Sequence, residues 1–148
     1  MAVAWPSVKD ALAALVVTLV PDGVLVIDGP LPQGNRPKRY ITVGWQPSTD
    51  DDSAGSYEQT SLSDGFAADE TGTVLLEIAA LSGDPVIPDA FAVVDLLHES
   101  IQTDQTLGGV LGPLGTMAIT TDVVEAQNRR GAVQRLLVSL SYTAALTT

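Results

Sequence analysis

The segment that most restricts the fold is residues 136–146, LLVSLSYTAAL, near the end of the chain. Its two alternating sets of positions are Leu136, Val138, Leu140, Tyr142, Ala144 and Leu146 on one side, and Leu137, Ser139, Ser141, Thr143 and Ala145 on the other. Such alternation predicts a β-strand with one face against a core. Residues 117–125 predict a second strand, and the sequence AQNRRGA between the two predicts a hairpin around residues 127–131.

Four earlier segments also have the character of strands. Segments rich in β-branched residues or with alternating apolar and polar positions favour extended structure, and they occur at residues 24–28, 39–45 and 71–81, with only a weak alternation at residues 58–63. In residues 71–81, Glu77 is predicted to point away from the side shared by Val74, Leu76, Ile78 and Ala80. Leu75 and Leu81 lie on the Glu77 side, so neither face of this strand is expected to be fully wet.

A first helix is predicted over residues 7–20, with Ser7 as its N-cap and Asp10 at capping-box spacing. Its apolar stripe at helical period consists of Val8, Leu12, Leu15, Val16 and Leu19. The opposite side is also weakly apolar, since it carries Ala13, Ala14 and Val17. A helix of this kind requires contacts on both sides, either within its own domain or with another subunit.

A second helix is predicted from Pro88 to about Gln105, after an abrupt break at Ser-Gly-Asp-Pro. Proline suits the first turn of a helix, and Asp89 in that turn complements the positive helix end. The predicted apolar stripe is Ala90, Val93, Val94, Leu97 and Ile101. The predicted wet face is Asp95, Glu99 and Gln102.

The order of these elements is a helix, a run of strands, a second helix and a strand pair. Strands grouped in this way favour an α+β fold, with a mostly antiparallel sheet and the two main helices packed on one face. A length of 148 residues favours a single domain over residues 1–148.

Charge and cysteine content exclude several classes of function. The net charge of −11 argues against binding to nucleic acid through phosphates and against docking on anionic lipid. Disulfides, thiolate catalysis and cysteine-bound metals are excluded because the chain has no cysteine. No apolar run has the length of a membrane span or the flanks of a signal peptide. We therefore expect a soluble intracellular product.

No motif in the chain predicts an enzyme, a cofactor or a metal site. His98, the only histidine, is expected at the edge of the second helix's apolar stripe, and the alternative is a ligand or a base. The glycines of residues 107–115 predict turns, because no Gly-Lys-Ser/Thr follows them as in a phosphate-binding loop. Asp50, Asp51 and Asp52 lack the spacing of a calcium loop. They predict a solvated loop tip, and the alternative is a contact surface that becomes ordered on assembly.

Six of the seven basic residues form two groups in the sequence, Arg36, Lys38 and Arg39, and Arg129, Arg130 and Arg135. One interpretation is ordinary surface charge near loops. The other is complementarity, in which basic segments of one copy face acidic segments of the next and set the register of a head-to-tail contact.

Four segments in a fixed order show a resemblance to a known family. They are VLVIDGPLPQGNRPKRYITVGW, DETGTVLLEIAALSGD, DAFAVVDLLHESIQTDQTLGG and RLLVSLSYTAAL. With this order the chain resembles the tail terminator, or tail completion, proteins of long-tailed bacteriophages of the siphophage type, particularly those of actinobacterial phages. The segment PVIPDAF lacks the basic residue that the family commonly carries before the second helix.

The resemblance implies a structural virion protein without a cofactor. Such a protein forms a ring, usually a hexamer, that caps the tail tube, ends tail polymerisation and joins the tail to the head connector. The implied partners are other copies of the chain, the tail tube protein and the connector proteins, with DNA passing through the lumen without specific binding and no membrane involved. The protein is assembled in the host cytoplasm and then resides in the virion.

Within this interpretation, two sets of residues are predicted to make contacts. The two basic groups are assigned to the interface between subunits. The polar loop of residues 46–57, including Asp50, Asp51, Asp52 and Tyr57, is assigned to contact with the tube or the connector.

Three other functions remain open from the sequence. One is another neck or tail protein, either a head–tail adaptor or the tube protein, which would polymerise without stopping at a ring. Another is a small acidic binding module for a basic partner, which would stay monomeric. The last is a small α+β enzyme with a site near His98.

Overall fold

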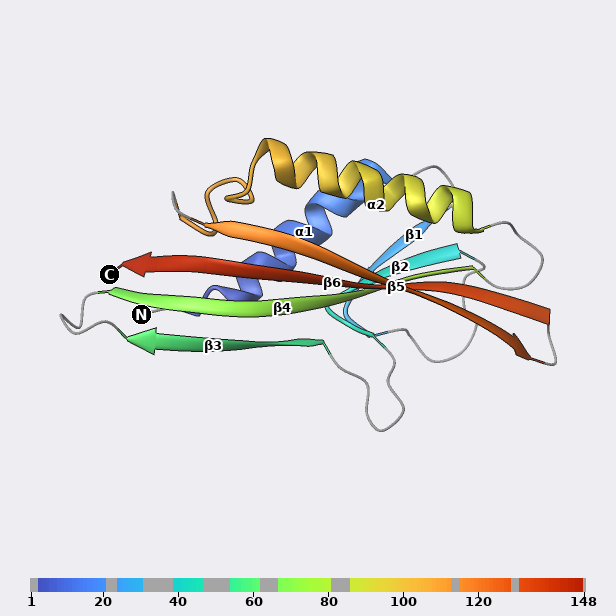
Figure 1. Ribbon diagram of the computed structural model, residues 1–148, viewed down its shortest axis with the longest axis horizontal. Helices are drawn as coiled ribbons and strands as arrows, with labels where there is room; N and C mark the ends of the chain where they lie inside the picture. The colour runs from blue at the N-terminus through green and yellow to red at the C-terminus, as the bar shows by residue number, and fades with distance from the viewer. Residues whose placement is uncertain are drawn as a thin grey trace.

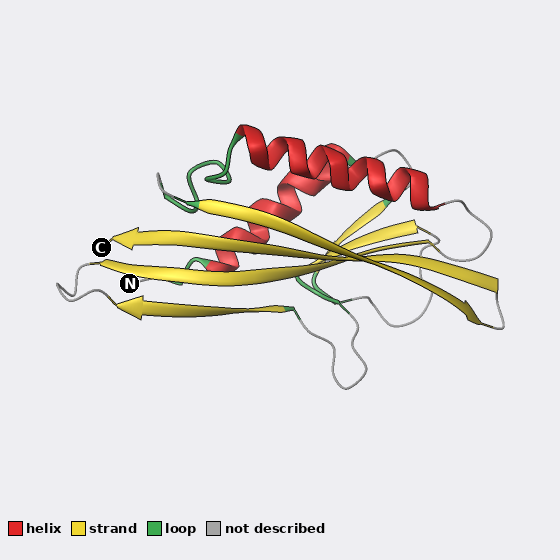
Figure 2. Ribbon diagram, viewed as in Figure 1, coloured by secondary structure: helices red, strands yellow, loops and turns green. Residues whose placement is uncertain are grey.

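The computed structural model describes residues 3–20, 24–30, 39–46, 54–61, 67–80, 86–112, 115–128 and 131–147. In chain order the elements are α1 (Trp5–Leu19), β1 (Leu25–Asp28), β2 (Arg39–Val43), β3 (Gly55–Ser61), β4 (Ala67–Ala80), α2 (Val86–Thr103), β5 (Thr116–Asn128) and β6 (Gly131–Thr147). The described strands form one six-stranded sheet, and both helices pack on the same face of it (Figures 1 and 2). The predicted α+β fold with helices on one face is confirmed.

The order of strands across the sheet is β1-β2-β4-β6-β5. β3 lies on the same edge of β4 as β2 but further along it, because β2 pairs with residues 76–80 and β3 with residues 68–74. Every pairing is antiparallel except that of β1 with β2. The predicted hairpin is confirmed as well, since β5 and β6 pair from Thr116 opposite Thr143 to Asn128 opposite Gly131.

The core lies between the helices and the sheet. Val8, Leu12 and Val16 of α1 are buried, and Leu15 and Leu19 are half-buried, so the predicted stripe of α1 is confirmed. From α2 the core receives Val93, Val94, Leu97 and Ile101, while Asp95, Glu99 and Gln102 are exposed as predicted. The sheet contributes Ile41, Val43, Val74, Leu76, Ile78, Leu136, Val138, Leu140, Tyr142 and Ala144. Apolar residues at helical spacing on the helices and at alternate positions on the strands therefore pack together in one aliphatic core layer.

The start of α1 differs from the prediction. The N-cap is Ala4 rather than Ser7, and its side chain makes no capping hydrogen bond. Pro6 occupies the first turn, where its fixed φ suits a helix start and its missing N–H is not needed. The Ala4 N–H instead donates to the buried carboxylate of Glu70 at 3.0 Å. The prediction of Ser7 is wrong because a cap supplied from a distant strand has no local sequence signature.

The side of α1 away from the core remains uncovered in the described structure. Ala14 and Val17 are exposed, and Val17 keeps 59% of its surface open to solvent. Ala13 is only half-buried. The second contact predicted for this helix is therefore not supplied by the described part of the chain.

The second face of β4 is covered at one end and open at the other. Glu77 is 1% exposed and accepts a hydrogen bond from the Tyr40 hydroxyl at 2.6 Å, while its N–H donates to the Thr42 hydroxyl at 3.2 Å. Toward the start of β4, Asp69 and Thr71 are exposed on the same face. The prediction that neither face of β4 is fully wet is thus correct near Glu77. Near Thr71 the second face is exposed to solvent.

Candidate functional site

An open trough of about 740 Å³ lies on the sheet face that the helices do not cover. The register places its outward-facing residues in two rows across four strands, Ser56–Thr73–Ser141–Ala118 and Glu58–Thr71–Thr143–Thr116. Thr73 is half-buried and the other seven are exposed. We call these eight residues the hydroxyl trough. Tyr57, Gly72, Tyr142 and Met117 separate the two rows, and their positions belong to the opposite face of the sheet.

The hydroxyl trough is neutral to acidic. Its hydroxyl groups come from Ser56, Thr71, Thr73, Thr116, Ser141 and Thr143. Threonine is β-branched and favours strands, and its hydroxyl can both donate and accept hydrogen bonds. Glu58 is the charged residue of the lining, and Asp69 precedes Thr71 on the same exposed face of β4. Among the described residues neither carboxylate forms an ion pair. This chemistry suits a partner that presents cationic hydrogen-bond donors.

A buried carboxylate fixes the strands behind the trough. Glu70 is fully buried on the helix-covered face. Its Oε2 accepts a hydrogen bond from the Tyr142 hydroxyl at 2.6 Å, and its Oε1 accepts from Gln59 Nε2 at 3.1 Å and from the Ala4 N–H at 3.0 Å. One carboxylate therefore joins β4 to β6, β3 and the start of α1. The nearby Trp5 indole N–H donates to the Thr73 carbonyl at 2.9 Å and holds the same helix end.

Tyr142 reaches Glu70 by crossing over a glycine. Gly72 pairs directly with Tyr142, and a Cβ at Gly72 would lie 2.5–2.7 Å from the hydroxyl and ring atoms of that tyrosine. A side chain at this position would displace the ring. Burial, followed by the hydrogen bond and the charge of Glu70, raises the pKa of Tyr142 well above its usual value. The phenol therefore remains a proton donor to the carboxylate over the physiological range.

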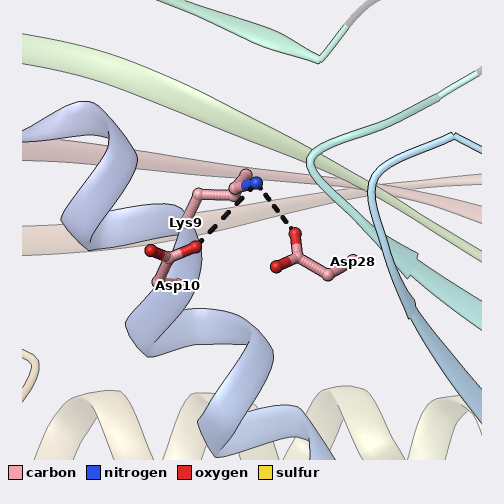
Figure 3. A network of polar contacts seen from close by, with 3 residues as sticks. All are labelled: Lys9, Asp10 and Asp28. Atoms are coloured by element: carbon pink, nitrogen blue, oxygen red, sulfur yellow. Dashed lines mark ion pairs between the residues drawn. The ribbon is translucent and has the colours of Figure 1, made fainter.

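Lys9 links α1 to β1 at the surface (Figure 3). Its Nζ lies 2.9 Å from Asp28 Oδ1 and 3.9 Å from Asp10 Oδ1. The stem of the side chain passes Gly44, where an added Cβ would lie 2.5 Å from Lys9 Cδ. No other lysine or arginine side chain belongs to the part of the chain that the structure describes. Lys9 is thus committed to a structural ion pair.

The structure places few of the predicted contact residues. Tyr57 keeps 52% of its surface exposed, but it lies in strand β3 and pairs with Gly72, so the prediction that it belongs to the loop of residues 46–57 is wrong. It contributes to the lining of the trough between the two rows. The other members of the predicted tube-contact loop, Asp50, Asp51 and Asp52, lie outside the described residues, as do Arg36, Lys38, Arg129 and Arg130. Only the backbones of Arg39 and Arg135 are described.

The register nevertheless relates the two basic groups. Arg39 pairs with Ala80 of β4, and Arg135 pairs with the adjacent Ala79 from the other side. Arg39 ends one basic group and Arg135 ends the other. The backbones of Arg39 and Arg135, which are far apart in sequence, therefore lie at the same end of the sheet, on either side of β4.

The segment after α2 forms turns, as its glycines predict. The carboxylate of Asp104 organises them by accepting hydrogen bonds from the Thr106 hydroxyl at 2.6 Å, the Thr106 N–H at 3.0 Å and the Gly108 N–H at 2.8 Å. These bonds, that of the Thr106 hydroxyl first, lower the pKa of Asp104. Leu107 has a positive φ of 54° within this turn. The local bonds account for Asp104 as a structural residue.

His98 is exposed on α2. Within the described residues there is no group of three or more histidine, aspartate or glutamate side chains that could hold a metal ion. No helix in those same ranges is long and apolar enough to cross a membrane.

Comparison with models of known protein families finds none that matches this chain, and comparison with characterised proteins finds no significant relative.

Proposed function

We propose that this chain is a structural virion protein that assembles as a ring on a phage tail tube. The ring ends tail polymerisation and joins the tail to the head connector. The observation that carries the proposal is the sheet itself, which is covered by helices on one face and left with an open, hydroxyl-lined region on the other. A ring subunit needs a rigid layer that a neighbour can complete, and it needs no catalytic group.

Three further features support this role. The uncovered apolar side of α1, with Val17 at its centre, provides a second contact surface. The net charge of −11 repels DNA phosphates, so that a ring of such chains lets DNA pass through its lumen without specific binding. The order of the sequence segments resembles that of tail terminators.

The proposed partners are further copies of this chain in a hexameric ring, the tail tube protein and the connector proteins. The basic groups, Arg36, Lys38, Arg39, Arg129, Arg130 and Arg135, are assigned to the contact between subunits. The segment with Asp50, Asp51, Asp52 and Tyr57 is assigned to the tube or the connector. The protein then belongs to the virion, after assembly in the host cytoplasm.

The test is the solution mass over a concentration series, by light scattering after size-exclusion chromatography, with and without added tail tubes. We expect a discrete ring, or a cap at one end of the tubes in electron micrographs. Open-ended growth would contradict the proposal and indicate a tube protein. A monomer that ignores tubes at every concentration would also contradict it.

A further inference from the structure

The β5–β6 hairpin extends beyond the rest of the sheet at one end (Figure 1). β4 ends at Ala80, which pairs with Gln134, so residues 131–133 of β6 pair only with residues 126–128 of β5 among the described strands. We call residues 126–133 the arm. A two-stranded ribbon is marginally stable alone in water and is normally stabilised by packing on a further element. The described part of the same chain supplies no third strand there.

The arm carries two residues of one of the two basic groups in an acidic chain. Asn128 pairs with Gly131, and the two residues between them in the sequence are Arg129 and Arg130. Arg135 follows on β6, and residues 126–135 contain three arginines and no acidic residue. In a chain with a net charge of −11, such a segment is attracted electrostatically to acidic surfaces of other copies.

The hydroxyl trough has the complementary chemistry and lies at the other end of the same hairpin. Thr116 and Thr143 of the trough form the first pair of β5 with β6, whereas the arm contains the last pair. The 13 residues of β5 span about 40 Å at roughly 3.3 Å per residue. A straight hairpin of this length cannot bring its own arm to its own trough. Any contact between the two must join different molecules.

The acceptors of the trough match arginine. Guanidinium groups donate several hydrogen bonds in a fixed plane and bind most strongly to carboxylates. Glu58 lines the trough and Asp69 lies beside it, both exposed and without an ion pair among the described residues. The six hydroxyl groups of the lining add neutral acceptors around these charges.

We propose that the arm of one copy docks in the hydroxyl trough of a second copy. The contact joins different surfaces of the two subunits, so it repeats head to tail and closes into a ring when the rotation per subunit allows. This inference rests on the proposed ring and specifies its subunit contact.

Because the chain has no cysteine, the contact can be tested by disulfide trapping in the full-length protein. The test variant carries Asn128→Cys on the arm and Thr143→Cys in the trough. Mild oxidation is expected to produce a ladder of linked species on a non-reducing gel, and the ladder should end at the mass of the ring. The matched control carries Asn128→Cys with Ala92→Cys, because Ala92 is exposed on α2 over the other face of the sheet. An equal ladder from the control, or none from the test variant with and without tubes, would overturn the proposal.

A charge exchange provides a second, independent test. One variant reverses the arm with Arg129→Glu and Arg130→Glu, and the other reverses the trough with Glu58→Lys and Asp69→Lys. Each alone sets like charges against each other in its own contacts, so self-association is expected to weaken about tenfold or more. In an equimolar mixture every arm finds an opposite trough on the other variant, and assembly is expected to return. Unchanged association of either variant, or no recovery in the mixture, contradicts the contact.

These outcomes separate this inference from the proposed function. Wild-type rings that cap tubes, together with failure of both tests, would leave the terminator in place and remove only the contact between arm and trough. A trapped ladder with open-ended growth would retain the contact and remove the terminator. Circular dichroism of each variant verifies folding, which exposed positions such as Glu58 and Asp69 are expected to leave intact.

Discussion

The two faces of β6 differ sharply although they belong to one strand. Leu140 and Tyr142 point into the core beneath the helices, whereas Ser141 and Thr143 point into the hydroxyl trough. On the first face, aliphatic burial supplies stability. On the second, exposed hydroxyl groups add little to folding and remain available to a partner. The difference indicates that stability and interaction can be altered separately by substitutions one residue apart.

The largest expected effect is the loss of stability on substitution of Leu140, compared with that of its neighbour Ser141 on the other face of β6. Leu140 is fully buried, so Leu140→Ala should lower the free energy of unfolding by about 3–5 kcal/mol through lost burial and a cavity. Ser141→Ala changes an exposed side chain and should stay within about 0.5 kcal/mol. Urea denaturation of the two variants measures both values. Similar losses from both substitutions would show that the trough face is also part of the stabilising core.

Gly72 is the position at which the two faces are expected to be coupled. It forms part of the trough floor, but a Cβ there would meet Tyr142 on the helix-covered side at 2.5–2.7 Å. Gly72→Ala should therefore destabilise the fold by about 1–3 kcal/mol through overpacking. Adding Tyr142→Leu should make the two losses less than additive, because the clash then disappears. Strict additivity in a double-mutant cycle would show that the Tyr142 ring is not what excludes a side chain at position 72.

The hydrogen bond from Tyr142 to Glu70 predicts a pH dependence. Tyr142→Phe leaves a buried carboxylate oxygen without its donor and should cost about 1.5–3 kcal/mol at neutral pH. The pKa of Tyr142 is raised in the folded state, so this stabilisation is full below the unfolded-state pKa of about 10 and is lost as the pH rises above it. The wild type should accordingly lose stability between about pH 10 and 12 more steeply than Tyr142→Phe. Parallel pH profiles would contradict this assignment.

The sequence predicted the structure correctly wherever the regular spacing of apolar residues was enough to define a helix or a strand. The alternation of residues 136–146 identified β6 and its buried face, and the helical stripes identified Val8, Leu12 and Leu97 as core. β4 was predicted to begin at Thr71 but begins at Ala67. The prediction missed Asp69 and Glu70 because acidic residues do not favour a strand in the sequence. Glu70 is buried only because Tyr142, Gln59 and α1 satisfy its oxygens, and those partners are distant in sequence.

The candidate site was less predictable for a similar reason. The hydroxyl trough is made of single residues from four strands, and only the register brings Ser56, Thr73 and Ser141 into one row. The repeated pattern of Ser139, Ser141 and Thr143 was the available signal, but such a pattern is typical of any wet face. The grouping of basic residues was visible in the sequence. The position of Arg39 and Arg135 at one end of the sheet was not visible, because it depends on how β2 and β6 flank β4.

The smallest expected effect concerns Lys9, whose partner Asp28 is a surface carboxylate, in contrast to the buried Glu70. Asp28 is half exposed, and its ion pair with Lys9 lies in water, where side-chain entropy and salt offset most of the attraction. Lys9→Met keeps the stem beside Gly44 and removes the charge, so it should cost about 0.2–1 kcal/mol, and less at roughly 1 M salt. Glu70→Gln has the same loss of one charge in a buried site and should cost more, with little dependence on salt. Denaturation at two salt concentrations measures both variants. If Lys9→Met lowers the free energy of unfolding as much as Glu70→Gln does, the ion pair between Lys9 and Asp28 stabilises the position of α1 more than expected for an exposed pair.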